Sequence, residues 1–105
     1  MSEEQKFEVI ISDAALAMLD SHVEFLARVS EKAATNLMEE ILSDIESLSE
    51  HPQRFPVFEN QFIADNRYHK MLSARRYLVI YEVNNANVFV DHIVDCRQNF
   101  EWLIV

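Results

Sequence analysis

The side chains best suited to chemistry are basic and lie close together in the second half of the chain. Residues 66–77 contain no acidic residue. The bases and the histidine of this stretch are Arg67, His69, Lys70, Arg75 and Arg76. Arginine forks and a lysine point charge suit phosphate oxygens. From composition alone the stretch is interpreted as an ordinary solvated hairpin, and an anion site is the functional alternative.

Cleavage of RNA without a metal would use such residues in defined roles. It needs a base for the 2′-hydroxyl proton, cations for the charged phosphorane and an acid for the leaving oxygen. His69 is the candidate base, because histidine is the side chain most often used for acid–base chemistry, and Arg67, Arg76 and Arg97 would supply the cations. The spacing alone does not require these side chains to converge.

The sequence gives less support to metal, nucleotide or thiol chemistry than to anion binding. The histidines show no metal-ligand spacing and there is one cysteine, so we expect no metal and no cofactor. The chain has no glycine, which excludes the Gly-dependent phosphate loops. Cys96 and His92 would lie about 13 Å apart along a strand, too far for an activating contact. The carboxylates of Glu39, Glu40 and Asp44 are interpreted as a solvated helix face.

Composition and charge place the chain among soluble globular domains. Its 105 residues predict one domain, 1–105, with half the residues apolar and a formal charge of −9. Residues 1–50 carry 12 acidic and three basic side chains, and the rest carry six of each. Net acidity argues against nucleic acid as a partner. With no apolar run of membrane length, no signal peptide and a single cysteine, we expect a cytoplasmic protein without a membrane partner.

Hydrophobic spacing predicts the elements that position these residues. A strand is expected at Phe7–Ile11, followed by two helices capped by Ser12 and Ser30 and ended by Pro52. The expected apolar stripes of the two helices are Leu16, Leu19, Val23 and Leu26, then Leu37, Met38, Ile41, Leu42, Ile45 and Leu48. A helical hairpin of this kind needs a partner surface to bury its stripes.

Three strands are expected after the helices, at Arg67–Leu72, Tyr77–Val83 and Val88–Arg97. Asn84 and Asn85 are expected to take the left-handed positions that glycine would normally fill, since we expect only Asn, Asp or His to replace glycine there. Residues 98–105 are consistent with a helical turn or an edge strand. The fold class is α+β, β-αα-βββ, with the helical hairpin on one face of a small antiparallel sheet and the other face free.

Alternation predicts which strand residues face the helices. In the central strand, Tyr77, Val79, Tyr81 and Val83 share one side. In the last strand the Val-rich side is the expected core face, and Arg97 is expected on the opposite side, beside carboxylates. The residues of that Val-rich side are Val88, Val90, His92, Val94 and Cys96.

Several motifs in order along the chain carry a family resemblance. After the opening strand come Ser12-Asp13-Ala14-Ala15 and a Leu-x-x-x-Pro exit from the helices at Leu48–Pro52. The second half contributes Arg67–Leu72, Tyr77–Val83 and Ile93–Arg97. The chain resembles the RelE/ParE superfamily of toxins from bacterial type II toxin–antitoxin modules over nearly its whole length, and the family fold agrees with the β-αα-βββ order.

The resemblance implies a growth-inhibiting toxin that a cognate antitoxin neutralises. ParE-like members poison DNA gyrase, whereas RelE-like members cleave mRNA on the ribosome. Arg97 matches an arginine that RelE-like nucleases use, and His69 and Lys70 fall near the basic positions of that group. Two departures stand against nuclease activity: Leu78 replaces an arginine, and residues 100–103 lack the catalytic tyrosine or histidine.

We therefore favour a ParE-like toxin that binds its target. In that interpretation Arg67, Arg75 and Arg76 contact the target, whereas His69, Lys70 and Arg97 are the catalytic candidates if the chain is an enzyme. A RelE-like mRNA endonuclease and an inactivated toxin-fold remnant are the alternatives.

Overall fold

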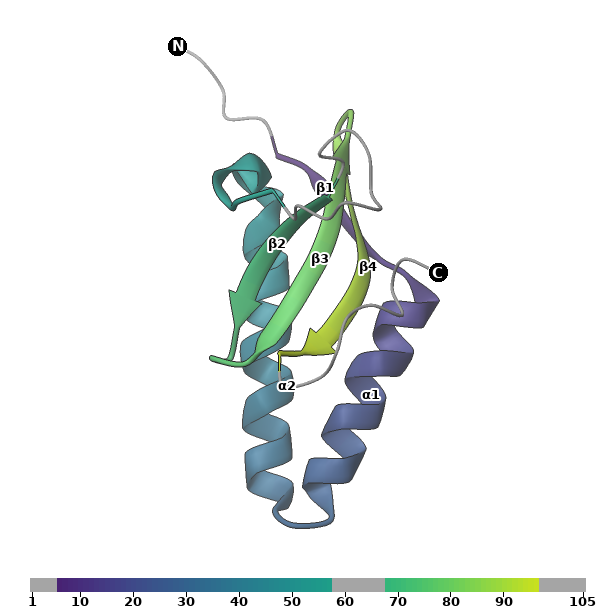
Figure 1. The fold of residues 1–105 in the computed structure, drawn as a ribbon, viewed down its shortest axis with the longest axis vertical. Coiled ribbons are helices and arrows are strands. Elements are labelled where there is room, and N and C mark those ends of the chain that lie inside the picture. Colours follow the sequence, from purple (N-terminus) through teal and green to yellow (C-terminus); the bar gives the residue numbers. More distant parts are fainter. Residues whose placement is uncertain (1–5, 58–67, 97–105) are drawn as a thin grey trace.

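A computed structural model describes residues 6–57 and 68–96 of the chain. A helical hairpin lies against one face of a four-stranded sheet, and the tip of the hairpin extends beyond the ends of the strands (Figure 1). The elements in chain order are β1 (Glu8–Ile11), α1 (Asp13–Ala27), α2 (Glu31–Glu46), the 3₁₀ turns η1 (Ser47–Ser49) and η2 (Pro52–Arg54), β2 (Tyr68–Ser73), β3 (Tyr77–Asn84) and β4 (Asn87–Asp95).

Both long helices begin at the predicted serine caps. The Ser12 hydroxyl accepts a hydrogen bond from the backbone N–H of Ala15 at 3.0 Å, and that of Ser30 accepts one from Ala33 at 3.1 Å. Each cap satisfies one of the N–H groups that the first turn of a helix leaves without an intrahelical partner. The two serines therefore fix where each arm of the hairpin starts.

The second helix was predicted to continue to Pro52, but it ends earlier. The α-helix ends at Glu46, and two 3₁₀ turns follow. His51 lies between them in a left-handed conformation, with a φ of 49°, and Pro52 begins the second turn. Proline fits the first position of a helical turn because its missing N–H has no intrahelical role there. Pro52 therefore starts a turn in this chain instead of ending a helix.

The sheet is mixed, which corrects the expectation of an antiparallel sheet. Its strand order is β1-β4-β3-β2. The hairpin pairs β2·β3 and β3·β4 are antiparallel, whereas β1 lies parallel to β4, with Glu8 opposite Asn87 and Ile11 opposite Val90. The first strand must pair parallel because the whole helical hairpin separates it from the other strands and carries the chain back across the sheet.

A β-bulge in β4 overturns the predicted alternation of that strand. Ile80 pairs with His92 and Tyr81 with Val90, so Asp91 is an extra residue without a partner on β3. Val88 and Val90 face the helices as predicted, but beyond the bulge Ile93 takes the core side and Val94 the other. Simple period-2 counting cannot see an inserted residue, so it assigned Val94 to the wrong face.

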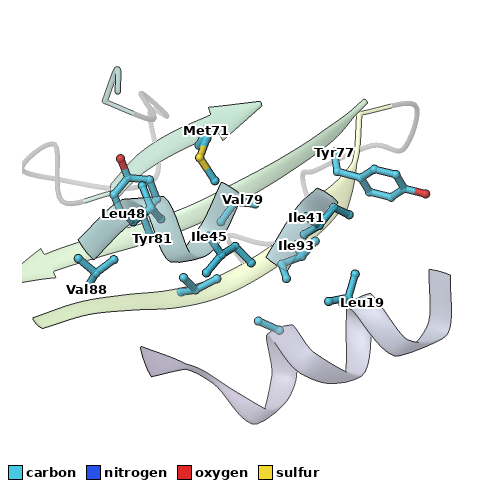
Figure 2. Close-up of a cluster of buried hydrophobic side chains, with 12 residues drawn as sticks. Leu19, Ile41, Ile45, Leu48, Met71, Tyr77, Val79, Tyr81, Val88 and Ile93 are labelled. Atoms are coloured by element: carbon cyan, nitrogen blue, oxygen red, sulfur yellow. The ribbon is translucent and has the colours of Figure 1, made fainter. Parts of the chain in front are cut away.

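The main core lies between the hairpin and the sheet (Figure 2). Buried side chains of both helices, η1 and the last three strands contribute to it. They include Leu19, Ile41, Ile45, Leu48, Met71, Val79, Tyr81, Val88, Val90 and Ile93. Two residues of the predicted helical stripes are exposed instead: Leu16 keeps 43% of its surface and Leu42 keeps 37%.

The sequence predicted that the opposite face of the sheet is free. The structure shows buried residues on that face. Ile80 and Val94 are 1% and 2% exposed there, and Met18, Tyr68 and Leu78 pack against them. Residues of both faces of β3 are therefore buried, which agrees with the nearly continuous apolar sequence of this central strand.

Positive backbone φ angles occur at some residues of unexpected type. Asn85 has a φ of 57°, as predicted for the β3–β4 turn, but Asn84 belongs to β3. Ala74 and Arg75 have φ angles of 50° and 72° in the β2–β3 turn. A side chain with a Cβ pays about 1–2 kcal/mol in this region. The expectation that only Asn, Asp or His would adopt it was wrong.

Asp44 contacts the end of the sheet and is not part of a solvated carboxylate cluster. Its Oδ2 accepts a hydrogen bond of 2.7 Å from the hydroxyl of Ser73, which is only 1% exposed. Since a buried hydroxyl without a partner is costly, we expect Asp44→Ala to lower the free energy of unfolding by about 1–2 kcal/mol in urea denaturation. Glu40→Ala, one turn earlier at an exposed position, is the control, and an equal loss in both variants would contradict the role of this contact.

Candidate functional site

His69, the predicted catalytic base, is built into the fold. Its ring stacks on Tyr81, with centroids 5.4 Å apart and planes 18° from parallel. The Nδ1–H of His69 donates to the carbonyl oxygen of Phe55 at 2.9 Å. The backbone N–H of Lys70 donates to the carbonyl of Pro56. These contacts hold residues 55–57 along the outer edge of β2, which is a structural role for His69.

The described members of the predicted basic cluster do not converge on one place. His69 pairs across the sheet with Tyr81 on the helix face, whereas Lys70 pairs with Ile80 on the opposite face. Arg75 and Arg76 lie in the turn beyond Ser73, roughly 13 Å further along the strand from His69 by strand rise. The other two candidates, Arg67 and Arg97, lie outside the described residues, as do residues 98–105.

The structural role of His69 gives a direct prediction. In His69→Phe the aromatic ring still stacks on Tyr81, but the hydrogen bond to Phe55 is lost. We expect the free energy of unfolding in urea to fall by about 1 kcal/mol. Unchanged stability in His69→Phe would contradict the structural role of His69.

The thiol of Cys96 is not activated. Partial burial and the neighbouring Asp95 both raise its pKa above the ordinary value, which disfavours the nucleophilic thiolate. Burial lowers the pKa of His92, so its neutral form is favoured near pH 7. The expectation that these two residues do not form a nucleophilic pair stays consistent with these directions.

One groove brings a predicted residue together with others that the sequence did not single out. We call it the Arg76 groove, and its volume is about 450 Å³. It lies where the second half of α1 passes the ends of β3 and β4. Its lining residues are Ser21, His22, Phe25, Leu26, Arg76, Tyr77 and Asp95.

Tyr77 organises the groove from the end of the main core. Figure 2 shows its ring directed away from the rest of the core cluster. The edge of the His22 ring meets the Tyr77 ring at 5.1 Å and 70°. The Arg76 guanidinium lies 5.4 Å from the centre of the same ring, and its Nη2 is 3.5 Å from the Tyr77 hydroxyl. Stacking on aromatic faces leaves guanidinium N–H groups available to a ligand.

The groove is better suited to binding than to catalysis. It offers aromatic and aliphatic surface from α1 and a half-buried guanidinium from the turn. Phe25 remains 71% exposed at its rim. Convergent apolar surface with a few polar groups is what recognition sites use for affinity and orientation. The arrangement fits an apolar side chain next to an anionic group.

Sequence reasoning identified Arg76 but missed its neighbours. No sequence pattern singles out His22, and Phe25 lies outside the predicted stripe of α1. The position of Phe25 off the core stripe could have identified it as part of a binding surface. A large aromatic residue off the core stripe of an amphipathic helix is expected to be exposed.

The described residues offer neither a metal site nor a membrane-spanning helix. Over residues 6–57 and 68–96, no three His, Cys, Asp or Glu side chains lie close enough together to hold a metal ion. Within the same residues, neither helix has the length and apolarity that crossing a membrane requires.

The fold is that of a known structural class. Among solved structures, a chain described as "Chromosomal ParDE TA system from P. aeruginosa" superposes with a TM-score of 0.72 at 11% sequence identity. The match covers 87% of this chain and 97% of that chain. A comparison with curated proteins finds no significant match. The element order and this superposition show that the chain shares the α+β fold of that structure.

The sequence itself narrows the class further. The sequence model of the family described as "ParE toxin of type II toxin-antitoxin system, parDE" matches residues 9–100. The chain therefore belongs to the ParE toxin family of type II toxin–antitoxin systems. The resemblance inferred from the ordered motifs is confirmed.

Proposed function

We propose that this chain inhibits bacterial growth by binding a cellular target, DNA gyrase, and that a cognate antitoxin protein neutralises it. Membership of the ParE toxin family is the observation that carries the proposal. The geometry agrees with binding without catalysis, because His69 is engaged by Phe55 and Tyr81 and is separated from Lys70 by the sheet.

The charge distribution also supports a protein target over an RNA-rich one. The chain has a formal charge of −9, and its excess acidity falls in residues 1–50, which include both helices. Docking against ribosomal RNA would bring these carboxylates toward phosphates and would weaken binding. A protein partner can avoid the acidic hairpin or offer it basic side chains.

The target is tested with purified components. We expect the purified chain to inhibit supercoiling of relaxed plasmid by DNA gyrase in a dose-dependent way. We also expect it to leave mRNA intact in a purified translation system. Cleavage of the message with unaffected supercoiling would identify a RelE-like endonuclease instead. No effect in either assay, together with normal growth on expression, would identify an inactivated relative and overturn the proposal.

A further inference from the structure

The tip of α1 exposes more apolar surface than the packing of a monomer explains. Phe25 is 71% exposed and Val29 is 80% exposed. Phe25 lies in the last turn of α1, and Val29 follows the end of the helix, where its backbone N–H donates to the carbonyl of Leu26. Single exposed apolar residues are ordinary, but neighbouring large ones beside a groove indicate an interaction site.

The apolar tip is continuous with the Arg76 groove. Phe25 lines the groove together with Leu26, and the hairpin tip extends past the ends of the strands, so the sheet does not cover it (Figure 1). The turn on the other side of the groove carries Arg75 and Arg76. The groove therefore places an exposed aromatic side chain opposite a short basic turn.

The charge distribution around the Arg76 groove favours a partner segment that carries a carboxylate. The described segment 68–77 holds Lys70, Arg75 and Arg76 and no acidic residue, whereas the hairpin is strongly acidic. A carboxylate on a partner would be repelled by most of the hairpin surface and attracted to this turn. Asp95 lines the groove but is only 4% exposed, so Arg76 presents the more accessible charge.

We propose that the Arg76 groove and the adjoining tip of α1 bind one amphipathic segment of the antitoxin. A large apolar side chain of that segment packs between Phe25 and Leu26, and a carboxylate close to it in sequence pairs with the Arg76 guanidinium. This inference rests on the proposed function, because it requires that an antitoxin exists. It adds the surface that the antitoxin contacts and the chemistry of the contacting segment.

A small free anion fits the groove less well than such a segment does. Arg76 is only half-buried, and the Asp95 carboxylate lines the same groove. A lone anion would gain little from one solvated guanidinium near a carboxylate. An anchored apolar side chain adds the buried area on which affinity at interfaces depends.

The inference is tested by titrating the chain with the purified protein that the adjoining gene encodes, using isothermal calorimetry. We expect Arg76→Glu to weaken binding by about 30-fold or more and Phe25→Ala by about tenfold. The matched controls are Lys6→Glu, which makes the same charge change at a 72% exposed side chain outside the groove, and Leu16→Ala at an exposed position of the same helix. We expect both controls to change affinity less than twofold.

The possible outcomes separate the two proposals. Unchanged affinity in both Arg76→Glu and Phe25→Ala, with the antitoxin still binding the unaltered chain tightly, would overturn the groove assignment and leave the proposed function intact. Loss of growth inhibition in these variants without loss of antitoxin affinity would assign the groove to the toxin's target and also overturn it. No binding of the adjoining gene product to the unaltered chain would overturn both. Thermal unfolding of each variant verifies that it is folded.

Discussion

Ile41→Ala should lower the free energy of unfolding by roughly 3–4 kcal/mol, a large share of the roughly 5–15 kcal/mol that a small domain has in total. Ile41 is 0% exposed and lies on α2 in the centre of the cluster that joins the hairpin to the sheet (Figure 2). Truncation removes buried methyl groups and leaves a cavity that the surrounding helices and strands can close only in part.

The next residue provides the matched control. Leu42 belongs to the same predicted stripe but is 37% exposed, so Leu42→Ala should cost about 1 kcal/mol or less. Urea unfolding followed by circular dichroism measures both variants. Equal losses in Ile41→Ala and Leu42→Ala would contradict the described packing of α2 against the sheet.

Tyr81 should make the stability fall steeply at alkaline pH. Burial raises the pKa of its phenol from 10.0 to about 12, with nearby Arg54 acting weakly in the opposite direction. The phenol is 0% exposed and donates a hydrogen bond to the carbonyl of Pro52. In the unfolded chain the proton is released near pH 10, whereas the folded chain holds it until about pH 12.

The direction of the stability change follows from the order in which the unfolded and folded chains release this proton. The unfolded state loses the proton first, so the contribution of the neutral phenol is complete below pH 10 and is lost as pH rises through 12. Over that interval the loss should reach about 2–3 kcal/mol. Comparison with Tyr81→Phe between pH 9 and pH 11.5 cancels the other titrating groups. A parallel decline in the two proteins would contradict the burial of this hydroxyl.

Local signals predicted the elements well. Ser12 and Ser30 cap their helices because a hydroxyl beside the first N–H groups needs no tertiary partner, and the strand periods were readable for the same reason. Long-range relations were not readable. Three features depend on how distant segments fit together, and no residue type predicts them. They are the parallel pairing of β1, the bulge at Asp91 and the positive φ angles of Ala74 and Arg75.

The candidate site was predicted less completely than the fold. Residue type drew attention to His69, yet the ring is held by the Phe55 carbonyl and by Tyr81, neither of which sequence spacing relates to it. Arg76 was identified as a base in a basic stretch, and only the structure brings it beside His22 and Phe25. Chemistry-bearing residues can be found in a sequence, but their convergence is set by the tertiary fold.

The uneven charge of the chain is consistent with a protein that binds an acidic partner segment. Acidity confined to residues 1–50 leaves the β2–β3 turn as a basic place where an acidic partner segment can dock.

Growth on induction, with and without the adjoining gene, tests the central proposal most directly. We expect induction of this chain alone to reduce colony-forming units by at least tenfold, and co-expression of the adjoining gene to restore growth at the same toxin level. Normal growth with abundant, folded protein, in the presence and absence of that gene, would contradict the proposal that this chain acts as a toxin.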